Sequence, residues 1–145
     1  FNNTHDNAHQ TTGSIFVQQY PNKKIINIAL SDVGVGIPHN ICKKVNQEHD
    51  SLAILLATTE GFTTRSTPRN AGAGLDIFLR VLARNKGSAA IYSNRGALSC
   101  ITKNQSLDKI PWIPAGWYPG TLFDINFRTD TIEKVEGDEE ERFEW

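Results

Sequence analysis

Apolar residues occur in short runs along most of this chain, and the spacing within each run distinguishes strands from helices. Residues 14–20 and 24–30 are rich in β-branched and aromatic side chains and flank the turn Pro21-Asn22-Lys23, which predicts a β-hairpin. The same features predict a second hairpin and a final strand, over residues 88–93, 97–102 and 122–127.

Other segments carry their apolar residues at helical spacing. The clearest helix opens at Gly74-Leu75 and ends at Asn85-Lys86-Gly87, which is a typical helix terminus. Residues 39–47 predict a second helix, and a third is expected to start from a cap at Asp50 or Ser51.

Two segments show neither period. Residues 58–73 contain Gly61, Pro68 and Gly72 and have the length of a functional lid, whereas residues 105–119 carry three prolines and are predicted to be a long connection. From Glu133 onwards the chain is acidic, which is typical of a solvated or disordered tail.

Together these elements predict an α+β fold, a two-layer α/β sandwich with helices on one face of a mixed, mostly antiparallel sheet. We expect one domain over residues 1–130 and an acidic tail over residues 131–145. The absence of methionine, even at position 1, indicates a domain truncated at its N-terminus.

Composition narrows the function. The 145 residues have a net charge of −1, which argues against a nucleic-acid or membrane-surface binder. No apolar run is long enough for a membrane span, no signal peptide is evident, and the two cysteines are far apart. A cytoplasmic, reduced setting is the expectation, with one disulfide left open.

The most informative stretch is Ser31-Asp32-Val33-Gly34-Val35-Gly36-Ile37-Pro38, which follows the apolar strand 24–30. A carboxylate at a strand end can accept a hydrogen bond from a ligand amino group, and glycines let a ligand approach the main chain. Taken alone, the stretch is equally typical of a strand followed by a tight turn.

Three further motifs stand in order around it: Asn3-Thr4-His5-Asp6-Asn7-Ala8, Gly72-Ala73-Gly74-Leu75, and Gly120-Thr121 before the last strand. With them the chain, up to about Arg128, resembles the ATP-binding domain shared by sensor histidine kinases, the heat-shock chaperone ATPase, gyrase-type topoisomerases, mismatch-repair ATPases and anti-sigma kinases. This is the Bergerat or GHKL fold. The resemblance implies that ATP and Mg²⁺ bind.

At the base end, the resemblance makes Asp32 the acceptor for the adenine amino group and Thr121 its support. Gly34 and Gly36, with Ile37 in the same loop, match the residues against which the base lies. Each of these positions has a purely structural alternative as a strand end or turn.

At the phosphate end, the resemblance makes Asn7 the Mg²⁺ ligand, because an amide oxygen suits a hard cation. Gly72 and Gly74 match the end of the lid, and the helix opening at Leu75 would offer its N-terminal N–H groups to phosphates. A helix-face asparagine is the alternative for Asn7.

Asn3 departs from the ATPase branches, which place glutamate there as the general base. An asparagine cannot take a proton, so ATP hydrolysis is doubtful, whereas histidine-kinase-like transfer to a protein is compatible with it. Whether the chain is an ATP-dependent protein kinase stays open.

Two functions follow from the resemblance. The first is phosphotransfer in signal transduction, with a phosphoacceptor domain upstream or in trans and a homodimer formed through the missing region. The second is a nucleotide-gated interaction module, of the anti-sigma kind or a standalone ATP switch, with little or no hydrolysis. A structural domain that binds no nucleotide is a third possibility.

Overall fold

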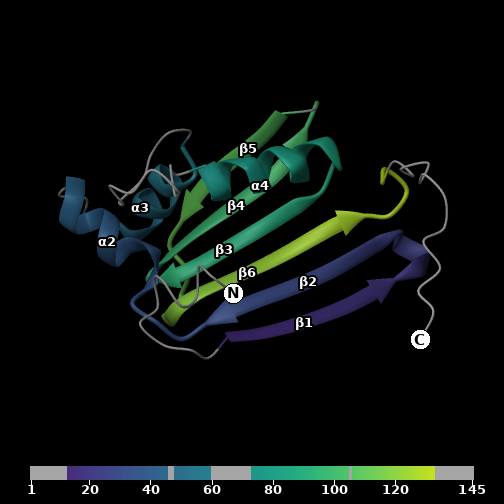
Figure 1. Ribbon diagram of the computed structural model, residues 1–145. Coiled ribbons are helices and arrows are strands. Elements are labelled where there is room, and N and C mark those ends of the chain that lie inside the picture. The colour runs from purple at the N-terminus through teal and green to yellow at the C-terminus, as the bar shows by residue number, and fades with distance from the viewer. Residues whose placement is uncertain (1–12, 46–47, 60–72, 105, 133–145) are drawn as a thin grey trace, which may run out of the picture.

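The computed structural model describes residues 13–45, 48–59, 73–104 and 106–132, which form one six-stranded sheet with helices on one side (Figure 1). In chain order the elements are β1 (Gly13–Tyr20), the 3₁₀ turn η1 (Pro21–Lys23), β2 (Ile25–Asp32), α2 (Gly36–Val45), α3 (Asp50–Ala57), α4 (Ala73–Arg84), β3 (Ser88–Asn94), β4 (Gly96–Lys103), β5 (Ser106–Trp112) and β6 (Tyr118–Arg128).

The strands lie in the order β1-β2-β6-β3-β4-β5, and all five pairings are antiparallel. The last strand of the chain, β6, therefore lies between the two hairpins and joins them. The predicted α+β sandwich is confirmed, and no parallel pair occurs among the described strands.

The core lies between one face of the sheet and the helices. Along β3 buried positions alternate with partly exposed ones, as expected for a strand with one face packed. Leu79 and Leu82 of α4 and Ile54 of α3 pack against Ile91 and Leu98 of the sheet. The described helices gather over β3, β4 and β5, and α2 also contacts β6 (Figure 1).

The segment 105–119 contradicts its prediction as a long connection. Ser106–Trp112 is strand β5, which pairs with β4 along its whole length and places Pro111 opposite Leu98. Proline cannot donate to a ladder, but β5 is an edge strand, where one side of the backbone needs no partner strand. Pro111, together with Asp108 and Lys109, is therefore compatible with a strand at the edge of the sheet.

The start of α3 also differs from its prediction. The N-cap position is His49, and no side-chain hydrogen bond caps the helix there, so neither Asp50 nor Ser51 is the cap. The Asp50 carboxylate instead accepts a hydrogen bond from the backbone N–H of Arg95 at 2.9 Å. This bond ties the beginning of α3 to the turn between β3 and β4.

Both cysteines are free thiols, with Cys42 partly buried and Cys100 buried, so the disulfide left open by the sequence is not formed. None of the helices in the described part of the chain is long and apolar enough to cross a membrane. The motif Asn3-Thr4-His5-Asp6-Asn7-Ala8 and the tail from Glu133 lie outside the described residues.

Candidate functional site

Four residues form a row across the helix-facing side of the sheet. Asp32 at the end of β2 lies opposite Thr121 of β6, Thr121 lies opposite Ser93 of β3, and Ser93 lies opposite Gly96 of β4. Residues directly opposed in an antiparallel pair share a face, and Ser93 lies two residues from the core residue Ile91. The row therefore faces the helices, at the end of the sheet where α2 begins.

The Asp32 carboxylate is partly buried in this row. Its Oδ1 accepts a hydrogen bond from the backbone N–H of Thr121 at 3.2 Å, and no other donor among the described residues reaches the carboxylate. Burial raises the pKa of Asp32 above its ordinary value of 3.8, and the Thr121 N–H offsets part of that shift. A partly desolvated acceptor with spare lone pairs is suited to a ligand that donates a hydrogen bond.

Gly120 makes the close packing around this carboxylate possible. It has φ +96°, in the left-handed region that favours glycine. A Cβ at this position would lie 2.6 Å from Asp32 Oδ1 and 2.6 Å from the Gly34 backbone nitrogen. Glycine is therefore required at position 120 both by the backbone angle and by the approach of the Asp32 loop.

We call residues 33–37, which comprise the connection after β2 and the first two residues of α2, the base loop. Gly36 has φ +77°, and a Cβ there would lie 2.6 Å from Ser93 Oγ. Two hydrogen bonds from the end of β3 hold the loop: Ile37 N–H donates to Ser93 Oγ at 2.9 Å, and Asn94 Nδ2 donates to the Val35 carbonyl at 3.1 Å.

The structure brings together Asp32, Gly34, Gly36, Ile37 and Thr121 of the predicted site residues. Gly34 belongs with them through its backbone nitrogen, which lies against Gly120, and Ile37 also packs against the hydrophobic core.

Gly74 and Leu75 lie in the first turn of α4. Leu75 packs against the core, whereas Gly74 is exposed, and a Cβ on it would meet no described atom within 4 Å. No hydrogen bond among the described residues joins either one to the base loop. Asn3, Asn7 and Gly72, with most of the expected lid, lie outside the described residues.

Sequence reasoning missed Ser93 and Asn94 and gave Gly120 no role of its own. The Gly120-Thr121 pair was a usable signal for Gly120. Ser93 and Asn94 offered no local signal in the sequence. They lie beside the base loop only because β3 pairs with β6 and α2 packs against both strands.

No group of three or more His, Cys, Asp or Glu side chains suited to a metal ion occurs within the described ranges. The Mg²⁺ prediction rests on Asn7, so the described residues do not test it.

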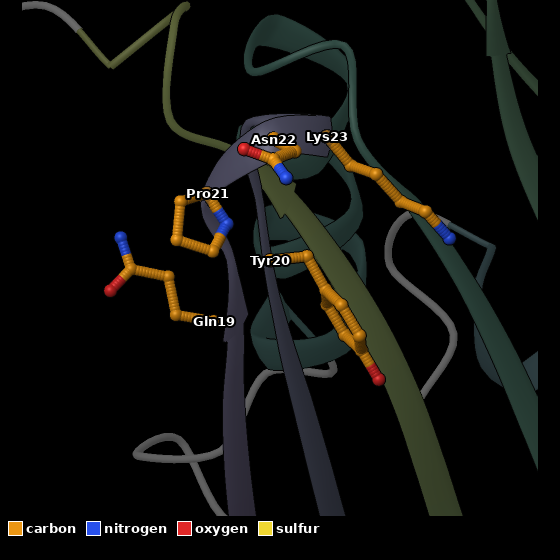
Figure 2. A pocket seen from close by; sticks show the side chains of 5 residues that line it. All are labelled: Gln19, Tyr20, Pro21, Asn22 and Lys23. Carbon is orange, nitrogen blue, oxygen red and sulfur yellow. The ribbon is translucent and has the colours of Figure 1, made fainter.

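A shallow hollow of about 220 Å³ lies at the opposite end of β2 from Asp32, around the β1–β2 turn. Figure 2 shows that its lining side chains spread around the turn and do not converge on one point. Its lining residues are Gln19, Tyr20, Pro21, Asn22 and Lys23. Ligand sites usually offer convergent polar groups, so this hollow is not part of the candidate site.

Comparison with known proteins gives little beyond the fold class. No protein-family model matches the sequence, and no curated protein matches it. Among solved structures, the chain is similar to the ATPase region of Saccharomyces cerevisiae topoisomerase II, with a TM-score of 0.47 and 9% sequence identity. That similarity covers 89% of this chain and 35% of the other, so this chain spans about a third of its length. A similarity at this level shows neither the family nor the activity of this chain.

Proposed function

We propose that this chain is an ATP-binding domain, with the adenine held at the row of Asp32 and Thr121. The observation that carries the proposal is the Asp32 carboxylate. It is partly buried at a strand end, it uses Oδ1 to accept Thr121 N–H, and it keeps lone pairs for a ligand beside the base loop.

The chemistry of this acceptor favours adenine. The exocyclic amino group of adenine donates a hydrogen bond, whereas guanine has a carbonyl oxygen at the same ring position, which the carboxylate would repel. An acceptor left unpaired in a partly buried site costs about 1–3 kcal/mol, so the site discriminates between the two bases.

The phosphates are assigned to the first turn of α4, near Gly74. The first N–H groups of a helix lack intrahelical partners and attract anions, and a 12-residue helix has a developed dipole. Gly74 has neither a positive φ nor a described neighbour that requires glycine. A close approach of phosphate to the main chain is a reason for glycine at this position.

The finer proposal is that Mg²⁺ is held by Asn7 and that the γ-phosphate passes to a protein residue, as in histidine-kinase-like signalling. Asn3, which cannot act as a general base, supports transfer to protein over hydrolysis by water. The same asparagine also supports a nucleotide-gated interaction module, in which ATP binding alone changes a protein contact.

Calorimetric titration of the chain with ATP and GTP, each with Mg²⁺, tests the base site. We expect ATP to bind at least tenfold more tightly than GTP, and Asp32→Asn to remove most of this preference. Asp124→Asn is the matched control, because Asp124 is a partly buried carboxylate on the neighbouring strand and accepts its hydrogen bond from Asn27, outside the row. Equal affinity for ATP and GTP in the unaltered chain would contradict the proposal.

Incubation with ATP labelled on its γ-phosphate separates the two finer functions. Label on protein, in the presence of the phosphoacceptor domain, is the result expected for phosphotransfer. Mg²⁺-dependent binding with neither labelled protein nor released phosphate is the result expected for the interaction module.

A further inference from the structure

Helix α2 begins without a capping residue of its own. The residues before it are Gly34 and Val35, which have no side-chain oxygen, although the first N–H groups of a helix need acceptors from outside the helix. Serine, threonine, aspartate or asparagine usually supplies that oxygen locally. Here Ser93 of β3, 56 residues away, accepts the Ile37 N–H at 2.9 Å.

The Ser93 hydroxyl can accept this bond because its own hydrogen is used elsewhere. Ser93 Oγ donates to the Gly120 carbonyl at 2.6 Å, and the side chain is fully buried. A hydroxyl has one hydrogen and two lone pairs, so its bond to Gly120 leaves the oxygen free to cap Ile37. One buried hydroxyl thus joins the start of α2 to β3 and to β6.

The glycines on either side of Ser93 match this arrangement. Gly36 has no side chain between the helix start and Ser93 Oγ, and Gly120 bends the backbone so that its carbonyl meets the same hydroxyl. Gly120 also packs against Asp32 Oδ1. The Ser93 hydroxyl is therefore connected to both ends of the base loop, through Gly120 at the Asp32 end and through Ile37 at the α2 end.

We propose that Ser93 is a positioning residue for the base site: its hydroxyl caps α2 from the neighbouring strand and so fixes the base loop relative to Asp32. Ser93 does not touch the nucleotide and acts through Ile37 N–H and the Gly120 carbonyl. Asn94, which donates to the Val35 carbonyl in the middle of the loop, acts in the same way with one bond. The inference rests on the proposed function, because the loop is assigned to the base of ATP.

The test compares Ser93→Ala with Ser99→Ala in nucleotide titration and amide hydrogen exchange. Ser99 lies on the next strand and its hydroxyl also accepts a side-chain bond, from Trp112 Nε1 at 3.0 Å, but it faces the other side of the sheet. We expect Ser93→Ala to raise the Kd for ATP about tenfold, to reduce the preference for ATP over GTP, and to speed exchange of the Ile37 amide. Ser99→Ala is expected to change none of these three.

A second variant keeps the proposal testable if Ser93→Ala does not fold. Asn94 has φ 54°, which glycine tolerates, so Asn94→Gly removes the side-chain bond without straining the backbone. We expect a rise in Kd of about threefold and faster exchange in the base loop.

The outcomes separate the two proposals. No ATP binding by the unaltered chain would overturn the proposed function and this inference with it. Normal ATP binding by the unaltered chain, with Ser93→Ala matching it in Kd and in preference for ATP over GTP, would overturn the inference alone, even if the variant melts at a lower temperature. In that case Ser93 would be only a structural residue.

Discussion

Two carboxylates on opposite faces of the sheet have different surroundings. They are Asp32 on β2 and Asp124 on the paired strand β6. On the face that no described helix covers, Asn27 Nδ2 donates to Asp124 Oδ1 at 2.5 Å, to the Ile125 carbonyl at 3.3 Å and to Asn126 Oδ1 at 3.2 Å. On the helix-facing side, Asp32 receives one backbone N–H, and burial raises its pKa.

The difference lies in the kind of donor that each carboxylate receives, which is a side-chain amide for Asp124 and a backbone N–H for Asp32. In the Asp124 network a single side-chain amide, that of Asn27, is shared among three acceptors. In the row on the helix-facing side, the Ser93 hydroxyl bonds to backbone groups of Ile37 and Gly120, and the Asp32 carboxylate accepts the Thr121 N–H and keeps further acceptor capacity. A polar group that folding leaves under-used in a partly buried place is a candidate for ligand binding.

Among the variants that test this difference between Asp32 and Asp124, Gly120→Ala is expected to have the largest effect. The added Cβ would collide with Asp32 Oδ1 and the Gly34 nitrogen, and alanine would be strained at φ +96°. We expect a loss of about 3 kcal/mol in the free energy of unfolding, measured in urea, together with loss of ATP binding. Gly116→Ala is the control, since its Cβ would meet nothing within 4 Å. Equal unfolding midpoints for the two variants would show that the packing around Asp32 is not tight.

Asp32→Asn is expected to separate binding from stability. Asparagine presents an N–H₂ group as well as an oxygen, so we expect ATP affinity to fall about tenfold to a hundredfold. The same change removes a charge that burial penalises, so the unfolding temperature at pH 7 is expected to rise. Asp124→Asn should do the reverse, with unchanged ATP affinity and lower stability, because it weakens the bond to Asn27. A fall in both properties for Asp32→Asn would indicate a structural carboxylate.

The pH dependence of stability has a definite sign. The folded-state pKa of Asp32 lies above its ordinary value of 3.8, so the folded chain favours the protonated acid. The contribution of protonated Asp32 to the free energy of unfolding is therefore present at low pH and is lost as the pH rises through its folded-state pKa. In unfolding experiments across this range, the advantage of Asp32→Asn should therefore grow from about pH 4 upwards and then level off. An advantage that shrinks with rising pH would contradict the raised pKa.

Gly74→Ala is expected to have the smallest effect. It tests the proposed phosphate site separately from the base site. Alanine in the first turn of α4 should raise the free energy of unfolding by about 0.5–1 kcal/mol, because no described atom obstructs its Cβ. We expect ATP to bind a few times more weakly, with adenosine binding unchanged, in parallel titrations. An equal loss for adenosine would place Gly74 at the base.

The sequence pattern was sufficient to predict most of the fold, because most of its strands and its clearest helix are encoded by patterns within a short stretch of the chain. The hairpins of β1–β2 and β3–β4 and the strand β6 follow from apolar runs and turn residues, and α4 follows from its 3.6-residue period. Strand β5 was missed because Pro111 and its charged neighbours argue against an interior strand and are accepted only at an edge. The cap of α3 was misplaced because Asp50 bonds to the distant Arg95.

Half of the candidate site was also predictable, for a related reason. Asp32 and the glycines of the base loop are contiguous, so their pattern is visible along the chain. Ser93 reaches the same loop only through the register of β3 against β6, which no local pattern encodes. The phosphate-end residues Asn3, Asn7 and Gly72 stay predictions, because they lie outside the described residues.

The most direct measurement compares ATP with the purine riboside triphosphate that lacks the exocyclic amino group, titrated into the unaltered chain and into Asp32→Asn. If the Asp32 carboxylate accepts a hydrogen bond from that amino group, ATP will bind the unaltered chain about tenfold more tightly than the analogue, and the difference will disappear in the variant. Equal binding of both nucleotides by the unaltered chain, or the same difference in both proteins, would contradict the assignment of Asp32 to the base.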